Sequence, residues 1–189
     1  ALAEMAVKYF ELNIKTSFLE EAGFRNNFFD IVTLTDVFEH ITDPEKMLMV
    51  IRKILKPDGI LFIKVPNGLF NIFKLRVAEI TGRLKNYDIF DSYEHVAHYS
   101  DVTIRKMLEK HGFQVVKIAL GSPVQIPVWH KFVGHYFQYP CPWRLDYKRQ
   151  TARGILHFIS KIEFYLYGKK VGYLAPNIIV IAKKTALPE

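Results

Sequence analysis

Hydrophobic residues along this chain form two kinds of pattern: short continuous runs, and stripes that repeat every three or four positions. The segment 28–67 contains two runs, 30–34 and 59–65, which are typical of buried parallel strands. Between the runs, Asp43 and Pro44 provide a helix start, and an apolar stripe follows them. The segment therefore predicts a strand–helix–strand unit.

The same two patterns predict further elements on either side of this unit. The expected helices cover residues 1–10, 68–82, 101–111 and 151–167. The expected strands cover residues 13–19, 113–120 and 177–182. Within the central unit, the motif Lys56-Pro57-Asp58-Gly59 is typical of a turn that ends a helix. The alternation of helices and strands indicates an α/β fold.

Charge and cysteine content narrow the range of partners and compartments. The formal net charge is +7, which favours acidic ligands or surfaces. The basic residues are not concentrated in one tract and no recognition motif accompanies them, so we expect no nucleic acid. Cys141 is the only cysteine, which excludes an intrachain disulfide. With no signal peptide or membrane-spanning run in these residues, we expect a cytoplasmic protein.

Polar side chains follow the two buried strands at the point where each strand ends. Thr35, Asp36, Glu39 and His40 come after the first strand, and Asn67 comes after the second. The carboxyl ends of parallel strands meet at one edge of a sheet, which is where open α/β sheets bind ligands. We therefore expect a crevice with functional groups at this edge.

These segments together resemble the second half of a class I S-adenosylmethionine-dependent methyltransferase. The similarity is to the broad group with a DxxEHxxDP loop, which includes the quinone O-methyltransferases, and the loop here covers residues 36–44. The other segments that resemble the group, in order, are SFLEEAGFRNNFFD (17–30), LKPDGILFIKVPN (55–67), EHVAHYSDVTIRKMLEKHGFQVV (94–116) and NIIVIAKK (177–184). The resemblance implies a Rossmann-like sheet, mostly parallel with an antiparallel last strand.

The chain departs from this family at the cofactor-binding turn. The family has a Gly-x-Gly-x-Gly turn, but no two of the ten glycines here have Gly-x-Gly spacing. We therefore expect a truncated fold without the family's strands 1 and 2, and weak binding of S-adenosylmethionine by this chain alone. In the family order 3-2-1-4-5-7-6, the strand over 13–19 would lie roughly 14 Å from strand 4. Residues 1–27 are thus expected to rearrange, to pair with another copy, or to be held by upstream chain, while strands 4-5-7-6 still form a sheet.

The resemblance also implies roles for individual residues. The positions that match the family's cofactor contacts are Phe18, Leu19, Thr35 and Asp36. The positions expected to contact the substrate are Glu39, Asn67, His95 and Tyr99. His98 and His40 are the candidate general bases, because imidazole ordinarily titrates near neutral pH. Each role has a structural alternative, such as a core position for Phe18 or a loop anchor for His98.

A metal ion is the alternative role for the same loop. In the quinone O-methyltransferases and the small-RNA 3′-end methyltransferases, a similar loop and a later histidine hold a divalent cation that activates the attacking hydroxyl. The corresponding set here is Asp36, Glu39, His40 and either His98 or His95, with Mg²⁺ or Mn²⁺ as the ion. Asp36 is shorter than the glutamate of the metal-dependent relatives, so we expect no metal.

The chain divides into two parts by composition. Residues 1–120 and 175–189 are expected to form the methyltransferase core, and residues 121–174 an aromatic and basic insert. We expect the insert to pack as a lobe over the sheet; the alternatives are a substrate lid, a homodimer face or a peripheral membrane contact. The expected function is methyl transfer from S-adenosylmethionine to a small-molecule or lipid-like acceptor. The alternative is a non-catalytic interaction module on the same scaffold.

Overall fold

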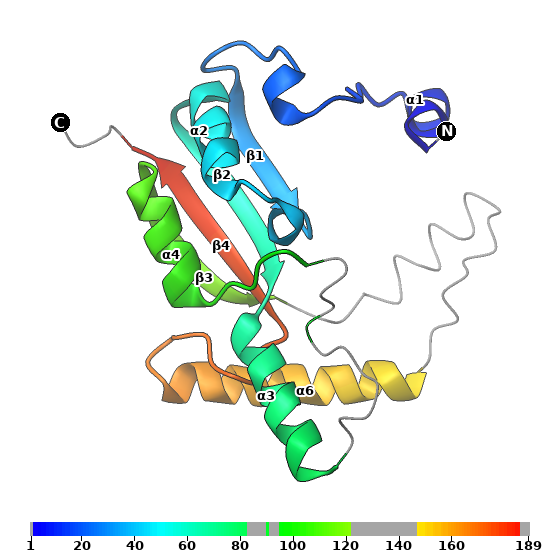
Figure 1. Cartoon of the computed structure of the whole chain (residues 1–189), viewed down its shortest axis with the longest axis vertical. Helices are drawn as coiled ribbons and strands as arrows, with labels where there is room; N and C mark the ends of the chain where they lie inside the picture. Colours follow the sequence, from blue (N-terminus) through cyan, green and yellow to red (C-terminus); the bar gives the residue numbers. More distant parts are fainter. Residues whose placement is uncertain (1, 83–89, 91–94, 122–146, 186–189) are drawn as a thin grey trace.

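The computed structural model describes residues 2–82, 90, 95–121 and 147–185. Its centre is a four-stranded sheet in the order β1-β2-β4-β3 (Figure 1). The strands are β1 Phe29–Thr35, β2 Leu55–Pro66, β3 Phe113–Gly121 and β4 Asn177–Lys184. β1 and β2 are parallel, and β4 is antiparallel to both of its neighbours. This confirms the predicted α/β fold and the order 4-5-7-6.

Helices cover one face of this sheet and one of its ends. The described helices are α1 Leu2–Phe10, α2 Pro44–Ile54, α3 Gly68–Ile80, α4 Asp101–Lys110 and α6 Tyr147–Leu166, with short 3-10 helices η1 Leu19–Glu21 and η2 Phe38–His40. α2 and α4 lie against the same face of the sheet (Figure 1). α3 and α6 lie at the end where β2 finishes and β4 begins.

Side-chain caps explain where the two covering helices begin. The Asp43 carboxylate accepts the backbone N–H of Lys46 at 3.0 Å, and Pro44 occupies the first helical position of α2. At the start of α4, the Ser100 hydroxyl accepts the backbone N–H of Thr103 at 3.2 Å. The α2 cap lies at the position that the sequence predicts.

The core lies between the sheet and these two helices. Leu61, Ile63 and Val65 alternate along β2 and are fully buried on the face that α2 and α4 cover. The opposite face is more open within the described part of the chain. On that side Ile31 remains 57% exposed and Ile60 remains 37% exposed.

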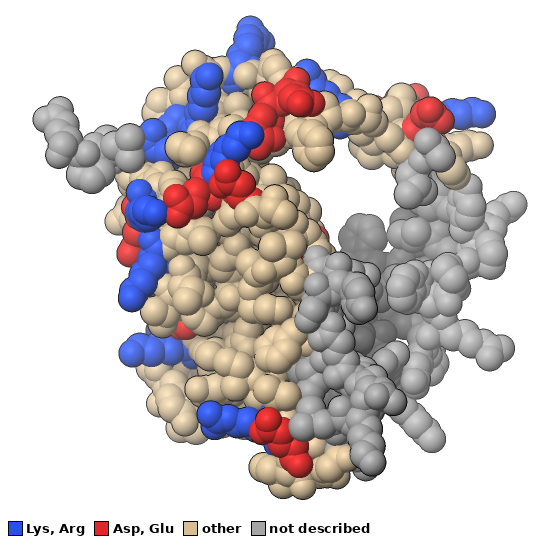
Figure 2. All heavy atoms as spheres, viewed as in Figure 1, with Lys and Arg blue, Asp and Glu red and all other residues tan. Residues whose placement is uncertain are grey.

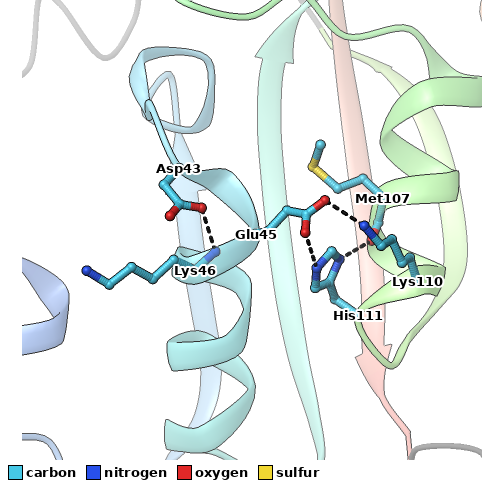
Figure 3. Close-up of polar contacts among 6 residues, drawn as sticks. All are labelled: Asp43, Glu45, Lys46, Met107, Lys110 and His111. Carbon is cyan, nitrogen blue, oxygen red and sulfur yellow. Dashed lines mark hydrogen bonds and ion pairs between the residues drawn. The ribbon is translucent and has the colours of Figure 1, made fainter.

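A carboxylate joins α2 to α4 at the surface. Glu45 contacts Lys110 Nζ at 2.7 Å and His111 Nε2 at 3.4 Å (Figure 3). His111 Nδ1 in turn lies 2.8 Å from the carbonyl oxygen of Met107. The hydrogen bond from Lys110 is the main reason that the pKa of Glu45 lies below its ordinary value of 4.5. The two covering helices are therefore connected outside the core as well as through it.

The predicted turn over residues 56–59 lies within β2 as a bulge. Phe29 pairs with Leu55 and Ile31 pairs with Ile60, so the residues between Leu55 and Ile60 protrude from the ladder. A Cβ on Gly59 would come within 2.9 Å of the carbonyl oxygen of Lys56. The bulge therefore needs glycine at this position.

The prediction of a strand over residues 13–19 is wrong. Residues 11–18 have no regular secondary structure, and η1 follows them. Leu12 is 52% exposed and Phe18 is 77% exposed. An isolated strand has no neighbour to bond its backbone groups or to cover its side chains. Figure 1 shows α1 set apart from the sheet.

The predicted aromatic insert, residues 121–174, is described only in part. Helix α6 and the loop that follows it to residue 174 are described, whereas residues 122–146 lie outside the described ranges.

Charged side chains gather over α1, α2 and one edge of the molecule in Figure 2. In the described ranges, no helix has both the length and the apolar composition needed to cross a bilayer.

Candidate active site

The end of β1 is held to the end of β2 by an ion pair. Asp36, directly after β1, adopts the left-handed backbone conformation (φ +54°), which Asp tolerates better than most residues. Its backbone N–H donates to the carbonyl oxygen of Lys64 at 3.0 Å. Its carboxylate oxygens lie 2.6 and 2.9 Å from Lys64 Nζ. The turn after β1 is thereby fixed at the carboxyl edge of the sheet, where Thr35 is exposed.

The next residues turn inward and carry the acidic group of the site. Phe38 is fully buried and stacks on the ring of Tyr99, with 5.1 Å between ring centroids. Glu39 follows it in η2 and is only 1% exposed. The backbone carbonyl of Glu39 accepts the N–H groups of Val96 and Ala97 at 3.0 and 3.1 Å. These two hydrogen bonds bring the loop over residues 95–99 against the turn after β1.

This pairing of loops places Glu39, His40 and His95 together. One ligand-type atom from each residue lies within 4.8 Å of the other two. The closest contact of His40 with the carboxylate is 3.9 Å, between Nε2 and Glu39 Oε1. Among the described residues, no group is within hydrogen-bond distance of the buried Glu39 Oε2 or of the buried His95 Nδ1. Burying a carboxylate oxygen without a partner carries a desolvation cost, which a bound hydrogen-bond donor or cation would offset.

Tyr99 adds a buried hydroxyl near the same carboxylate. Its side chain is 4% exposed, and its oxygen has no hydrogen-bond partner among the described residues. Burial, and secondarily the charge of Glu39, raises the pKa of Tyr99 to about 12. The phenol therefore stays protonated at neutral pH and can donate a hydrogen bond.

His98 lies beside this cluster rather than in it. Its ring centroid is 5.9 Å from that of His95, and its Nδ1 is 3.3 Å from Asn71 Nδ2. The ring centroid of Phe90 lies 5.2 Å from that of His98. Sequence reasoning missed Asn71, although a buried polar residue four positions after Asn67 lies on the same side of α3. The structure thus brings His95, rather than Asp36 or His98, to Glu39 and His40.

Asn67 is engaged inside the fold. It is fully buried, and its Nδ2 donates to the carbonyl oxygens of Gly172 and Ala175, each at 2.8 Å. Its Oδ1 accepts the backbone N–H of Leu69 at 3.1 Å and so caps α3. The next N–H, from Gly68, donates to the carbonyl of Tyr99. The side chain predicted to contact substrate therefore joins the start of α3 to the loop that contains Gly172 and Ala175.

Two of the residues predicted to contact the cofactor, Phe18 and Leu19, differ in burial. Leu19 packs against the edge of the core, whereas Phe18 is exposed and so is no core residue. A cavity of about 460 Å³ lies at the opposite end of the sheet, lined by Arg52, Pro57, Asp58, Gln114, Lys183, Lys184 and Thr185. None of the predicted site residues lines this cavity. The basic side chains that line the cavity have partners; for example, Lys183 Nζ lies 3.1 Å from Asp58 Oδ1.

Comparison with known proteins gives a consistent assignment for the first part of the chain. Residues 5–118, more than half of the chain, match the family model Methyltransf_23, described as a methyltransferase domain. The ubiquinone biosynthesis O-methyltransferase of Histophilus somni is 25% identical over 104 residues, 51% of this chain and 44% of that protein. The ubiquinone/menaquinone biosynthesis C-methyltransferase UbiE of Shewanella oneidensis is 28% identical over 110 residues, 51% of this chain and 43% of that protein. The chain thus spans less than half the length of these two curated relatives.

A solved structure supports the fold over almost all of the chain. The S-adenosylmethionine-dependent methyltransferase from Thermotoga maritima superposes with a TM-score of 0.52 at 15% identity, covering 97% of this chain and 69% of that one. At this level of identity the similarity shows the fold alone.

Proposed function

Because the chain belongs to this methyltransferase domain family, we propose that it is part of an enzyme that transfers a methyl group from S-adenosylmethionine to a small-molecule acceptor of the quinone type. The observation that carries the proposal is the buried Glu39 carboxylate beside His40 and His95, at the carboxyl edge of β1 and within the matched residues. The acceptor class is taken from the two relatives named for ubiquinone biosynthesis.

The cofactor side of the proposed site is the end of β1. S-adenosylmethionine, when bound, supplies an electrophilic methyl group on a positively charged sulfur. Thr35 and Asp36 are exposed at the strand end, and the ion pair with Lys64 holds Asp36 in place. Since these 189 residues contain no Gly-x-Gly turn, we assign to this chain only the β1 side of the cofactor pocket.

The acceptor side is the cluster around Glu39. His95 or His40 would take the proton from an acceptor hydroxyl, and the adjacent carboxylate would stabilise the resulting imidazolium. Tyr99, which stays protonated, would donate a hydrogen bond to the acceptor oxygen. His98, expected from the sequence to be a base, would orient the loop through its contact with Asn71. Alignment of acceptor and methyl group would supply most of the rate, and proton removal the remainder.

The test of cofactor use is isothermal titration calorimetry with S-adenosylhomocysteine. It should be applied to this chain and to any longer form that its gene encodes. We expect a clear heat of binding for a form that includes a glycine-rich turn, and weak binding for the 189 residues alone. If no form binds, the chain is a non-catalytic interaction module on a methyltransferase scaffold.

The test of the acceptor side is a pair of carboxylate variants in the form that binds cofactor. We expect Glu39→Gln to reduce kcat by about 10²–10⁴, the range typical of lost acid–base assistance. Asp30→Asn is the matched control, because Asp30 is a carboxylate at the opposite end of β1, paired with Lys56. An equal loss in both variants would show that the effect is structural.

A divalent cation is a second candidate occupant of the same cluster. Glu39, His40 and His95 supply one carboxylate and two imidazoles, and two of their buried atoms have no partner in the described residues. This donor set suits Zn²⁺ or Mn²⁺ better than Mg²⁺, which prefers oxygen ligands. If a cation occupies the cluster, dialysis against a chelator should abolish activity and Mn²⁺ should restore it. Unchanged turnover after dialysis would remove the cation from the proposal.

A further inference from the structure

Helix α6 buries two polar side chains and leaves a line of apolar side chains exposed. Ser160 and Glu163 are 1% and 9% exposed. Six apolar side chains of the same helix are between 42% and 79% exposed, namely Ile155, Phe158, Ile159, Ile162, Tyr165 and Leu166. Their spacing of three or four residues places them in one line along the helix, which we call the α6 stripe.

The outward orientation of the α6 stripe is fixed by the loop that follows the helix. The two carboxylate oxygens of Glu163 accept the backbone N–H groups of Tyr173 and Leu174, each at 2.9 Å. Gly172 lies so close that a Cβ there would be 2.2 Å from Glu163 Cδ. The loop is itself anchored by Ala175, which is fully buried. A rotation of α6 about its axis that buried the stripe would break both hydrogen bonds and leave the Glu163 carboxylate without these two donors.

The charges beside the α6 stripe have one sign. Lys161, Lys169 and Lys170 are exposed around the helix and its C-terminal end. Residues 147–176 contain six Lys or Arg and a single acidic residue, Glu163, which faces inward. Among the described side chains of residues 154–176, no exposed carboxylate accompanies these lysines.

The geometry points to an anionic lipid bilayer as the partner of the α6 stripe. An aliphatic and aromatic line flanked by lysines matches a helix that lies in the membrane interface, with its apolar side chains below the headgroups and its lysines at the phosphates. A symmetric pairing of two stripes would instead bring the lysines of both copies together, which like-charge repulsion disfavours. The proposal does not depend on methyl transfer.

Sedimentation with sucrose-loaded vesicles tests this surface. The chain should pellet with vesicles of phosphatidylcholine and phosphatidylglycerol, and less with phosphatidylcholine alone, because the lysines then lose their partners. Phe158→Glu should weaken partition into the anionic vesicles by at least about tenfold, the value expected for removing one buried phenyl group. Tyr165→Glu should act in the same direction. Met49→Glu is the matched control, because Met49 is 58% exposed on α2.

Several results would overturn the proposal. One is failure of the unmodified chain to pellet with anionic vesicles, and another is equal weakening by Met49→Glu. A dimer in light scattering that Phe158→Glu dissolves, without vesicle binding, would assign the stripe to a second copy. A large fall in melting temperature for both α6 variants, again without vesicle binding by the unmodified chain, would show that another part of this chain covers the stripe.

Discussion

Helices α2 and α6 have similar sequence patterns and opposite orientations. Both carry apolar residues every three or four positions. In α2 those residues face the sheet, with Leu48 and Ile51 fully buried, while Lys46 and Lys53 face solvent. In α6 the apolar line faces outward, because Glu163 is held by the loop behind it. The period of a pattern thus gives a helix two sides, and only contacts made elsewhere decide which side is inside.

The strongest test of this difference is truncation of one large apolar residue in each helix. Leu48→Ala should lower the free energy of unfolding by about 2–5 kcal/mol, because it leaves a cavity under α2. Phe158→Ala should change it by less than about 0.5 kcal/mol, because Phe158 is already 65% exposed. Urea unfolding measures both values. Equal losses would mean that the α6 stripe is buried after all.

An intermediate effect is expected where α6 meets its loop. Gly172→Ala would push the new methyl group into the Glu163 carboxylate and separate it from two N–H donors. We expect a loss of about 1–3 kcal/mol in thermal or urea unfolding. Gly154→Ala, in the same helix, meets no atom within 4 Å and should stabilise α6 by up to about 1 kcal/mol. Opposite signs for two identical substitutions would confirm how α6 is held.

The smallest effect concerns the surface contact of α2. Because the pKa of Glu45 is lower in the folded chain than its ordinary 4.5, its contacts stabilise the fold above that pH. The stabilisation is lost as the pH falls through the folded-state pKa. Glu45→Gln should therefore be less stable than the unmodified chain at neutral pH, with the difference vanishing in acid. A difference that persists at low pH would assign the effect to packing.

Local signals in the sequence were sufficient for much of the fold. Asp43 and Pro44 mark the start of α2 because a cap acts within one helical turn. The apolar runs of β1, β2 and β4 predicted strands because strands are rich in branched apolar residues. The expected burial of the run 30–34 is not met, because Leu34 is the only buried residue of β1. The sequence predicted a turn at Gly59, but it did not predict that this turn is a bulge within β2.

Features that depend on distant partners were not readable in the same way. Residues 13–19 have strand-like composition, but a strand forms only beside a neighbour. His95, rather than His98, lies beside Glu39 because two backbone hydrogen bonds to the carbonyl of Glu39 position its loop. Such backbone hydrogen bonds cannot be predicted from the identity of the side chains. The inward orientation of Glu163 depends on N–H groups ten and eleven residues away.

Strand β4 comes last along the chain and yet lies between β2 and β3. Leu61 pairs with Ala182, and Val115 pairs with the same residue from the other side. During synthesis, β2 and β3 therefore leave the ribosome with no strand between them and must wait for residues 177–184. Joining segments so far apart in sequence is slow, and their apolar faces stay uncovered meanwhile. The four-stranded sheet can therefore close only after β4 has been made.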